Sequence, residues 1–269
     1  MHLDKLQFES EIIQTQKAGD ATSLCEEHRD NYDAIIAVGG DGTVNEVARG
    51  LIGHPTAMGI VPNGSGNGLA RHLTYSMNIN KSVTQLTKAH KTAIDIIRVN
   101  GTPCFNIAGV GFDAHVAQLF QSTKSRGLIN YMLISAKEFM TYDYPCLKIT
   151  TDEKTYECER AFSLTLANAS QLGNNAVVAK DADLSDGMMD LCLIAKYPLW
   201  YLPVATTRLF SQSLHRSRYF SGGRSGKVVV DLPDQKEVAV QIDGEPLTTT
   251  NPITFEIEPL ALNVLIPLT

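Results

Sequence analysis

The chain has 269 residues, which is enough for one large domain or two modest ones, each with its own hydrophobic core. Hydrophobic residues make up 43% of it and charged residues 19%, proportions that are typical of a globular protein. The formal net charge of −6 argues against nucleic-acid binding, because phosphate backbones recruit basic surfaces.

The cysteines and the hydropathy pattern indicate the compartment. The five cysteines are widely spaced and form no CxxC pair, so we expect reduced thiols and neither a zinc site nor a disulfide framework. No apolar run reaches the ~18–20 residues that span a bilayer, and the N-terminal residues lack the apolar region of a signal peptide. These patterns predict a cytoplasmic protein without a transmembrane segment.

The first third of the chain alternates strand patterns with helical ones. Short apolar runs predict strands at residues 10–15, 32–38 and 56–61, and helical patterns begin at Asp20 and cover residues 45–51 and those from 69 onward. The runs at 32–38 and 56–61 are continuously apolar, as in strands that are buried on both faces of a parallel sheet. This alternation favours an open α/β sheet.

The texture changes near residue 94, where short strands begin to dominate. Strands are predicted at residues 94–99, 104–108, 146–150, 161–167, 189–194, 227–232, 238–242, 253–257 and 262–266, and helices at 114–142 and 199–210. Turn signals such as Asn100-Gly101 and Asp186-Gly187 separate several strands. We therefore expect an α/β domain over residues 1–93 and a domain rich in antiparallel strands over residues 94–269.

Two glycine-rich loops follow the two buried strands of the first domain. The first is VGGDGTVNE at residues 38–46, and the second is PNGSGNG at residues 62–68. Glycines let backbone N–H groups approach phosphate oxygens, and a following helix offers further free N–H groups. Ligands bind open α/β sheets at the carboxyl ends of the strands, so the two loops could face one nucleotide. The alternative is a pair of tight connectors without a ligand, with Thr43 as a helix cap.

These loops resemble the diacylglycerol kinase catalytic-domain family, which includes bacterial lipid kinases, sphingosine kinases and ceramide kinases. The resemblance extends in the expected order over nearly the whole chain, through AID at residues 93–95, AGVGFDA at 108–114, LSDGMMD at 184–190 and IDGEP at 242–246. It implies an NAD-kinase-like, Rossmann-like α/β domain, a larger antiparallel β-sandwich domain, and a nucleotide in the cleft between them. GGDGT also occurs in NAD kinases.

The resemblance implies an ATP- and Mg²⁺-dependent lipid kinase. Its motifs place nucleotide contacts on one set of residues: Thr15, Gly39, Gly40, Asp41, Gly42, Thr43, Val44, Asn45, Gly64, Ser65, Gly66 and Asn67. A carboxylate would accept the proton of the attacking lipid hydroxyl. That base is assigned to Glu245 with Asp243 in support, although the two roles could be exchanged. Asp41 is placed near the Mg²⁺–phosphate network.

A second acidic loop resembles a family element that holds a structural Mg²⁺. Asp186 would bind the ion through its side chain, and Asp183 and Met188 through their carbonyl groups. The alternative is an acidic turn before a strand. Asp113 lies where sphingosine kinases carry an acidic residue that can contact a sphingoid amine, and GSGN at 64–67 also resembles that branch, so the lipid is expected to be diacylglycerol-like or, slightly favoured, sphingoid- or ceramide-like.

Two further features bear on function. The family's N-P-x-S-G loop is missing, together with about 25–35 residues that precede the first helix in the family pattern, so the sheet would expose an edge. An NAD kinase and an inactive binding paralogue are the alternatives to a lipid kinase. The aromatic and basic residues of 199–218 suit a lipid interface, which would make the protein peripheral at the inner face of the membrane. The alternative is an ordinary helix that packs on the β-rich domain. A homodimer is left open.

Overall fold

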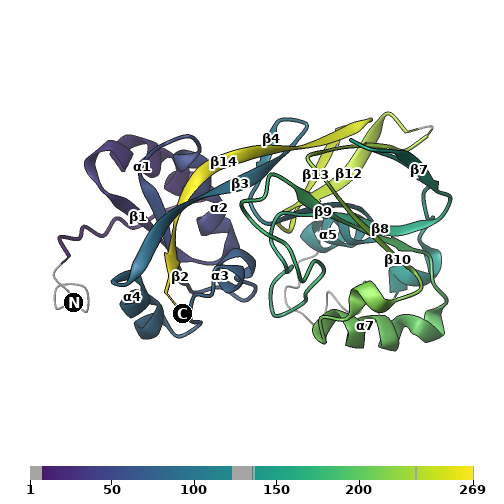
Figure 1. Cartoon of the computed structure of the whole chain (residues 1–269), viewed down its shortest axis with the longest axis horizontal. Helices are drawn as coiled ribbons and strands as arrows, with labels where there is room; N and C mark the ends of the chain where they lie inside the picture. Colours follow the sequence, from purple (N-terminus) through teal and green to yellow (C-terminus); the bar gives the residue numbers. More distant parts are fainter. Residues whose placement is uncertain (1–7, 123–134, 136, 234, 269) are drawn as a thin grey trace. The chain divides into compact units, whose positions relative to one another are not determined.

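The computed structural model describes residues 8–122, 135, 137–233 and 235–268, which form two compact units (Figure 1). The first unit comprises Met1–Ile96, Gly173–Asn175 and Pro259–Thr269, and the second comprises Ile97–Leu172 and Ala176–Glu258. The chain passes between them within two long strands, β3 (Ala89–Val99) and β14 (Ile253–Pro267).

This division differs from a single cut at residue 93. The C-terminal segment, which the strand pattern of the sequence assigned to the second domain, lies in the first unit because the end of β14 pairs in parallel with β2 (Ala57–Pro62), with Val264 opposite Met58. The pattern of residues 253–266 predicts two strands, but they form one strand that contains Leu260 at a φ of 50°.

The first unit is an α/β structure built on parallel strands. Residue Ala34 of β1 lies opposite Ala57 of β2, and the pairing continues to Gly39 and Pro62. The helices of this unit pack around these strands, α1 on α2 and α2 on both β1 and β2. Besides β2 and β3, its elements are α1 (Asp20–His28), η2 (Arg29–Asn31), β1 (Ala34–Gly39), α2 (Asp41–Leu51), α3 (Gly68–His72) and α4 (Ile79–Leu86).

Strand β1 has a single neighbour in the part of the chain that the structure describes, which is β2. Every residue of β2 is buried, whereas Val38 of β1 is 61% exposed. The predicted strand at residues 10–15 is wrong, because these residues adopt no regular structure and are exposed. Among the described strands, β1 therefore lies at the edge of its sheet.

Glu46 of the first glycine-rich motif has a structural task. Its carboxylate accepts hydrogen bonds from the N–H groups of Gly19 (2.9 Å) and Ala21 (3.1 Å), and its carbonyl accepts one from Thr22. Because the first N–H groups of a helix have no partner within the helix, this carboxylate stabilises the start of α1. Glu46 thus fixes α1 on α2.

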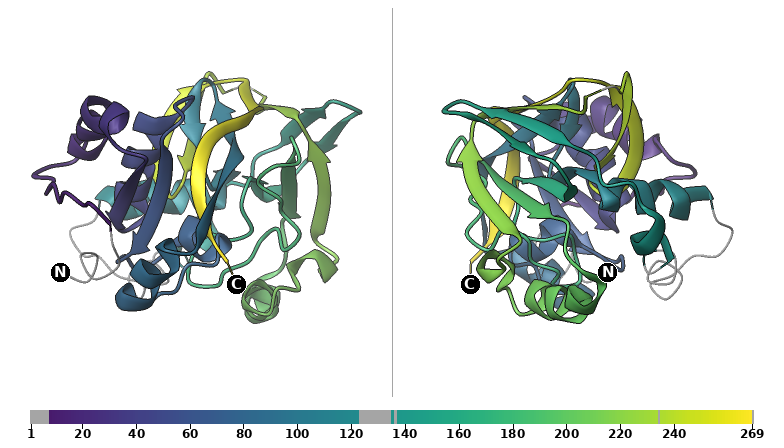
Figure 2. Two further views of the ribbon diagram at one scale, coloured as in Figure 1. Left: turned by 60° about the vertical axis from the view of Figure 1, so that its left-hand side comes forward. Right: turned by 90° about the vertical axis from the view of Figure 1, so that its right-hand side faces the viewer.

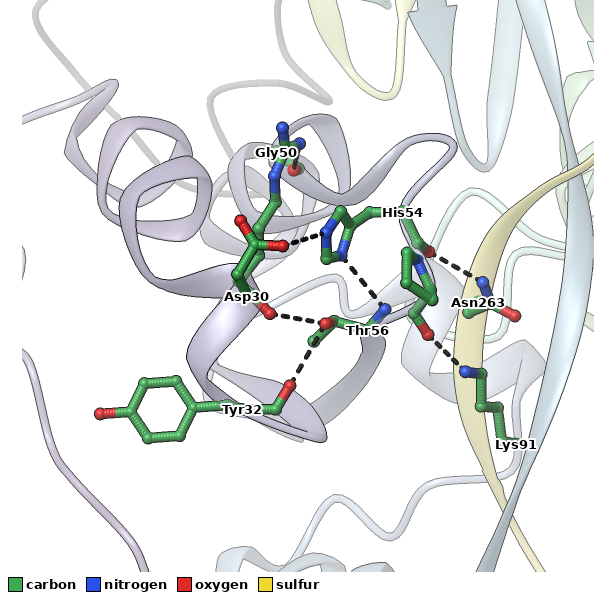
Figure 3. Close-up of polar contacts among 9 residues, drawn as sticks. Asp30, Tyr32, Gly50, His54, Thr56, Lys91 and Asn263 are labelled. Atoms are coloured by element: carbon green, nitrogen blue, oxygen red, sulfur yellow. Dashed lines mark hydrogen bonds and ion pairs between the residues drawn. The ribbon is translucent and has the colours of Figure 1, made fainter.

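A polar network joins the loops that lead into β1 and β2, at the N-terminal ends of these two strands (Figure 3). The imidazole of His54 receives the N–H of Thr56 at Nδ1 (3.2 Å), so Nε2 carries the proton that is donated to Asp30 (3.0 Å). Asn263 of β14 donates to the His54 carbonyl (2.9 Å), and Lys91 of β3 donates to the carbonyl of Pro55. The network thus orders the connection from α2 to β2.

The second unit is a β-sandwich. Its six-stranded antiparallel sheet has the order β10-β9-β8-β5-β12-β13, and β11, β6, β7 and the first half of β14 form the other layer. The strands are β4 (Thr102–Cys104), β5 (Ile107–Gly111), β6 (Leu147–Thr151), β7 (Thr155–Cys158), β8 (Ala161–Ala167), β9 (Met189–Ala195), β10 (Phe220–Ser225), β11 (Lys227–Asp231), β12 (Glu237–Ile242) and β13 (Glu245–Thr250). The helical elements are α5 (Phe112–Ser122), η3 (Leu199–Tyr201), α7 (Leu202–Phe210) and η4 (Leu214–Arg216).

The core of the sandwich lies between its two layers. Val110, Leu164 and Val240 from the six-stranded sheet pack with Ile149 and Phe255 from the other layer, all with an exposure of 0%. The inward residues alternate with outward ones, as in β6, where Leu147 and Ile149 are buried between exposed residues. Figure 2 shows the strands of this unit from two sides, with α7 beside them.

Most of the strands that were predicted in this unit are present. The expected strand at 104–108 is interrupted between β4 and β5, and β7, β10 and β13 were not predicted. The predicted helix at 114–142 includes α5 and helical residues 137–141, but 123–134 and 136 lie outside the described residues. Antiparallel pairing over a common core supports the β-sandwich that the resemblance implied.

Candidate functional site

The first glycine-rich loop joins β1 to the N-terminus of α2. Helix α2 begins at Asp41, and its N-cap residue is Gly40, which has no side chain that could accept a hydrogen bond from the first N–H groups of the helix. The early N–H groups of α2 therefore keep their capacity to bind an anion. Thr43 does not cap the helix; its Oγ1 lies so near Gly39 that a Cβ at Gly39 would be 2.6 Å from it.

The second glycine-rich loop lies directly against the first. A Cβ built on Gly64 would lie 2.5 Å from the Cα of Gly40, so no other side chain fits there. The Asp41 carboxylate joins the two loops, because it accepts the N–H groups of Asn67 (2.9 Å) and Gly68 (2.8 Å) at the start of α3. Asp41 thus holds the second loop, and both of its oxygens are engaged.

Within the second loop, Asn67 closes a ring with Gly64. The Asn67 side chain accepts the Gly64 N–H (3.0 Å) and donates to the Gly64 carbonyl (2.8 Å), while its own backbone is left-handed, with a φ of 53°. Asn67 is buried, but Ser65 is exposed at the tip of the loop. Ser65 and Asn63 are therefore the exposed side chains of this loop that a ligand can reach.

A third segment, Gly173–Asn175, lies against the second loop and was not predicted. A Cβ on Gly173 would lie 2.9 Å from the Cα of Gly66, and Asn174 donates its N–H to the Gly66 carbonyl (3.2 Å). Arg71 of α3 bonds both the Gly66 carbonyl (3.0 Å) and Asn175 (3.1 Å). The sequence signal was the run Gly-Asn-Asn, whose three residues all have positive φ.

The other residues of the first unit that were predicted to contact the nucleotide are either buried in α2 or exposed to solvent. Val44 and Asn45 are buried in α2, with exposures of 5% and 6%, so their side chains face the protein. Gly42 is exposed, and a Cβ added to it would meet no atom within 4 Å. Thr15 is exposed in the irregular segment before α1.

In the second unit, Asp243 and Gly244 form the turn between β12 and β13. Their φ angles are 52° and 85°, the left-handed pair of a tight hairpin, as the Asp-Gly signal predicted. The turn places Glu245 at the first position of β13, opposite Ile242, with an exposed side chain. Glu245 can therefore reach an external molecule.

The Asp243 carboxylate points back into the protein. It accepts the N–H groups of Phe105 (3.0 Å), Asn106 (2.8 Å) and Ile107 (3.0 Å), and the thiol of Cys104 (3.3 Å). These bonds explain why the strand expected at 104–108 breaks there, since its N–H groups face a carboxylate and not a strand. Burial raises the pKa of Asp243, and the three backbone N–H groups oppose that shift.

Asp113 lies near the same hairpin. It is in the first turn of α5, which packs against β12 and β13. A Cβ on Gly109 would lie 3.0 Å from Asp113 Oδ2 and 3.5 Å from Gln241 Nε2, and Gln241 in turn accepts the N–H of Gly244 (2.9 Å). Thus Asp113, Gln241 and the Asp243–Glu245 turn form one group, which we call the hairpin cluster.

The carboxyl group of Asp113 is buried without a full set of partners. Its Oδ1 is inaccessible and has no hydrogen-bond partner among the residues that the structure describes. Burial raises its pKa to about 7. A group of this kind is a candidate for contact with a polar ligand.

The predicted metal loop at 183–188 is already bonded within the protein. Asp183 Oδ1 accepts the N–H and hydroxyl of Ser185, and Asp186 Oδ1 accepts the N–H of Met188. Asp186 Oδ2 accepts the Arg224 guanidinium (3.3 Å). Across the described ranges, no three His, Cys, Asp or Glu side chains are grouped for a metal ion.

Arg224 therefore supplies positive charge at this loop. It also bonds Asp190 (3.2 Å) and the carbonyl of Asp181 (2.7 Å). A cation on the Asp186 side chain would compete with this guanidinium, so the arrangement does not favour Mg²⁺ here. The assignment of a metal to Asp183, Asp186 and Met188 stays a prediction.

Within the residues described by the structure, no helix is both long and apolar enough to cross a bilayer.

Comparisons with known proteins identify both parts of the chain. Residues 1–99 match the family model of the diacylglycerol kinase catalytic domain, and residues 106–266 match the YegS C-terminal NAD kinase β-sandwich-like domain. A diacylglycerol kinase of Bacillus subtilis (strain 168) is 30% identical over 249 residues, which cover 88% of this chain and 80% of that protein.

Solved structures show the same fold. A diacylglycerol kinase structure from Bacillus anthracis str. Sterne aligns with a TM-score of 0.75 at 21% identity, covering 99% of this chain and 88% of that one. An NAD kinase from Archaeoglobus fulgidus in complex with ATP aligns with a TM-score of 0.51 at 14% identity, covering 98% and 86%. The chain therefore belongs to the diacylglycerol kinase catalytic-domain family and carries that family's YegS-type β-sandwich in its C-terminal part.

Proposed function

We propose that this protein is an ATP- and Mg²⁺-dependent lipid kinase that phosphorylates a hydroxyl of a diacylglycerol-like or sphingoid- or ceramide-like lipid. The observation that carries the proposal is the pair of glycine-rich loops that Asp41 holds together at the start of α2. Family membership and the relatives' activity as diacylglycerol kinases support the same reaction.

The nucleotide is assigned to the first unit. Free N–H groups at the start of α2, with Gly40 and Gly42 lacking side chains, suit the phosphates of ATP. The hydroxyls of Ser65 and Thr43 are candidate donors, and Thr15 is kept as a further contact. Mg²⁺, when bound with the nucleotide, would neutralise charge on the transferred phosphoryl group.

The base is assigned to Glu245. Its side chain is exposed at the hairpin, whereas the oxygens of Asp243 are engaged by backbone N–H groups. Glu245 takes the proton of the lipid hydroxyl as the hydroxyl oxygen bonds to the γ-phosphorus and the bond to the bridging oxygen of ADP breaks. The supporting role is assigned to Asp243, whose bonds to residues 104–107 hold the turn that precedes Glu245.

Asp113 is assigned to the polar part of the lipid. Its unpartnered Oδ1 could accept a hydrogen bond from a substrate amine or hydroxyl. An amine held there would favour sphingoid lipids over diacylglycerol. The enzyme would act from the cytoplasm on a lipid at the membrane surface.

The direct test incubates purified protein with [γ-³²P]ATP, Mg²⁺ and diacylglycerol, sphingosine or ceramide in mixed micelles. The phospholipid product should appear, and Glu245→Gln should lower kcat by roughly 10²–10⁴-fold while ATP affinity and the unfolding curve stay unchanged. ATP binding without any labelled lipid would support the inactive-paralogue alternative. Labelled NAD phosphate would support the NAD kinase alternative, which the shared GGDGT motif and fold keep open.

A further inference from the structure

The outward side of α7 carries apolar residues that no part of its own unit covers. Leu199 and Trp200 in the turn before α7 are 48% and 67% exposed, and Val204 and Phe210 are 39% and 54% exposed. Pro203 and Thr207 lie on the same side of the helix, because residues spaced by three or four positions share a face. We call this set the α7 face.

The inward side of α7 accounts for the packing of the helix. Leu202 and Ala205 pack against an aromatic cluster that contains Phe139 and Tyr197, and Leu209 packs against a second cluster. One side of α7 thus packs on the two clusters, and this packing does not account for the exposed apolar residues on the other side. Large exposed apolar surfaces of this kind mark interaction sites.

The chain segment that carries this face is basic, and the nearby Asp181 and Asp190, which line a cavity with Gln212 and His215, are bonded to Arg224 or lie beside Lys180. Between Asp190 and Asp231 the sequence contains no Asp or Glu, although acidic residues outnumber basic ones in the whole chain, 29 to 23. Arg216 and Arg218 are exposed and Arg208 is half-buried. No ion pair joins these three to a carboxylate among the described residues, so their charges are available to an anionic partner.

Arg218 connects the basic and the apolar parts. Its guanidinium lies over the ring of Tyr219 at 4.9 Å and 6.0 Å from the ring of Trp200, and it bonds the Tyr219 hydroxyl (2.8 Å). Arg and Trp held together at the border of an apolar face match the polar and apolar layers of a bilayer surface.

We propose that the α7 face docks on the surface of an anionic phospholipid bilayer, with Trp200, Val204 and Phe210 in the interface and Arg208, Arg216 and Arg218 at the lipid phosphates. This inference rests on the proposed lipid kinase function and adds the surface through which the enzyme reaches its substrate. Apolar insertion and electrostatic attraction are both present, as stable peripheral binding requires.

The chain contains a single tryptophan, so the proposed insertion can be observed directly. The intact protein is titrated, without ATP, with vesicles of 30% phosphatidylglycerol in phosphatidylcholine, and with vesicles of phosphatidylcholine alone. On the anionic vesicles, Trp200 emission should shift to shorter wavelength and be quenched by brominated acyl chains. Trp200 emission that stays unchanged on the anionic vesicles would overturn the proposal.

Two variants and two matched controls separate the α7 face from general charge and hydrophobicity. Replacement of Arg208, Arg216 and Arg218 by Gln should weaken binding to anionic vesicles by roughly fivefold for each arginine, and Val204→Ser with Phe210→Ser should weaken it further at high salt. The charge control replaces Lys81, Lys88 and Lys148 by Gln, and the hydrophobicity control replaces the exposed Ile79 by Ser. Each control should leave the affinity for anionic vesicles within twofold of the wild-type value. Equal loss in variants and controls would overturn the proposal.

Lipid phosphorylation distinguishes failure of docking from failure of the proposed function. In detergent micelles without anionic lipid the α7 variants should turn over substrate like the wild type, and in anionic vesicles they should lose activity in proportion to binding. Vesicle binding without phosphorylation by the wild type would sustain the docking surface and sink the kinase assignment. If sedimentation without lipid instead shows a dimer that the α7 variants dissociate, a second copy covers this face and the proposal is wrong.

Discussion

Replacing Asp243 by Asn should destabilise the second unit and act on catalysis only through the position of Glu245. The carboxylate Oδ1 accepts three donors, from Asn106, Ile107 and Cys104, and Oδ2 accepts the N–H of Phe105. An amide keeps the oxygen at the Oδ1 position and turns its NH₂ group toward the Phe105 N–H. One buried donor is then unsatisfied, and the other three bonds lose the strength that the charge gave them.

The size of the effect follows from these bonds. An unsatisfied buried donor costs about 1–3 kcal/mol, and hydrogen bonds to a charged group are stronger than neutral ones by roughly 1 kcal/mol each. The neutral amide recovers part of this, because the buried carboxylate no longer has to be desolvated. We expect a net loss of about 2–4 kcal/mol in the free energy of unfolding, which lowers the urea midpoint by about 1 M.

Urea unfolding followed by circular dichroism measures this loss, and Glu237→Gln provides the control. Glu237 is exposed on β12 of the same hairpin, so its loss of charge should change the unfolding free energy by less than about 0.5 kcal/mol. An Asp243→Asn protein with an unchanged midpoint would refute the reasoning. If that protein also lost turnover, Asp243 would be the base.

Three further predictions concern other parts of the molecule. Gly64→Ala should weaken ATP binding and lower the melting temperature, because its Cβ would lie 2.5 Å from Gly40; Gly42→Ala, which meets no atom, should weaken ATP binding but raise stability by up to about 1 kcal/mol through helix propensity. Equal melting of both variants would contradict the close contact of the loops. Because burial raises the pKa of Asp113 to about 7, the folded protein holds a proton that the unfolded chain releases near pH 4, so this contribution to stability is present at low pH and declines as the pH rises through 7. Asp113→Asn should flatten that decline in a series of melts from pH 4 to 8, and an unchanged slope would show that Asp113 does not titrate there. Arg224→Met should lower stability at pH 7 by about 1 kcal/mol in thermal melts, since two partly exposed carboxylates lose their cation; a more stable variant would mean that the guanidinium is not needed at this loop.

Most elements of the fold could be predicted from hydrophobic patterns and turn residues. The buried runs at 32–38 and 56–61 became β1 and β2, and Asp243-Gly244 formed the tight turn that its residues predicted. The segment at 10–15 shows the limit, because its apolar residues have no neighbouring strand to pair with in the described chain. Strand patterns report local preference, and pairing partners come from the whole chain.

The contact between the two glycine-rich loops was predictable from the sequence, but the hydrogen bonds that hold them were not. Sequence reasoning placed the two glycine-rich loops after neighbouring parallel strands, and the structure puts their backbones in contact. It could not show that the Asp41 and Asp243 carboxylates accept hydrogen bonds from backbone N–H groups. The same sequence pattern is compatible with a carboxylate that binds a ligand and with one that stabilises the loop. Sequence reasoning also missed Gly173–Asn175, which lie about a hundred residues away in sequence from the loop that they touch.

The pairing of β14 with β2 sets an order on synthesis. The first unit lacks one of its strands until residues near Val264 have left the ribosome, whereas β1, α2 and β2 emerge early. The first unit of the nascent chain is therefore incomplete, with one flank of β2 open, throughout the translation of the β-sandwich. A chain that stopped before Val264 would leave that flank of β2 without the partner that β14 supplies.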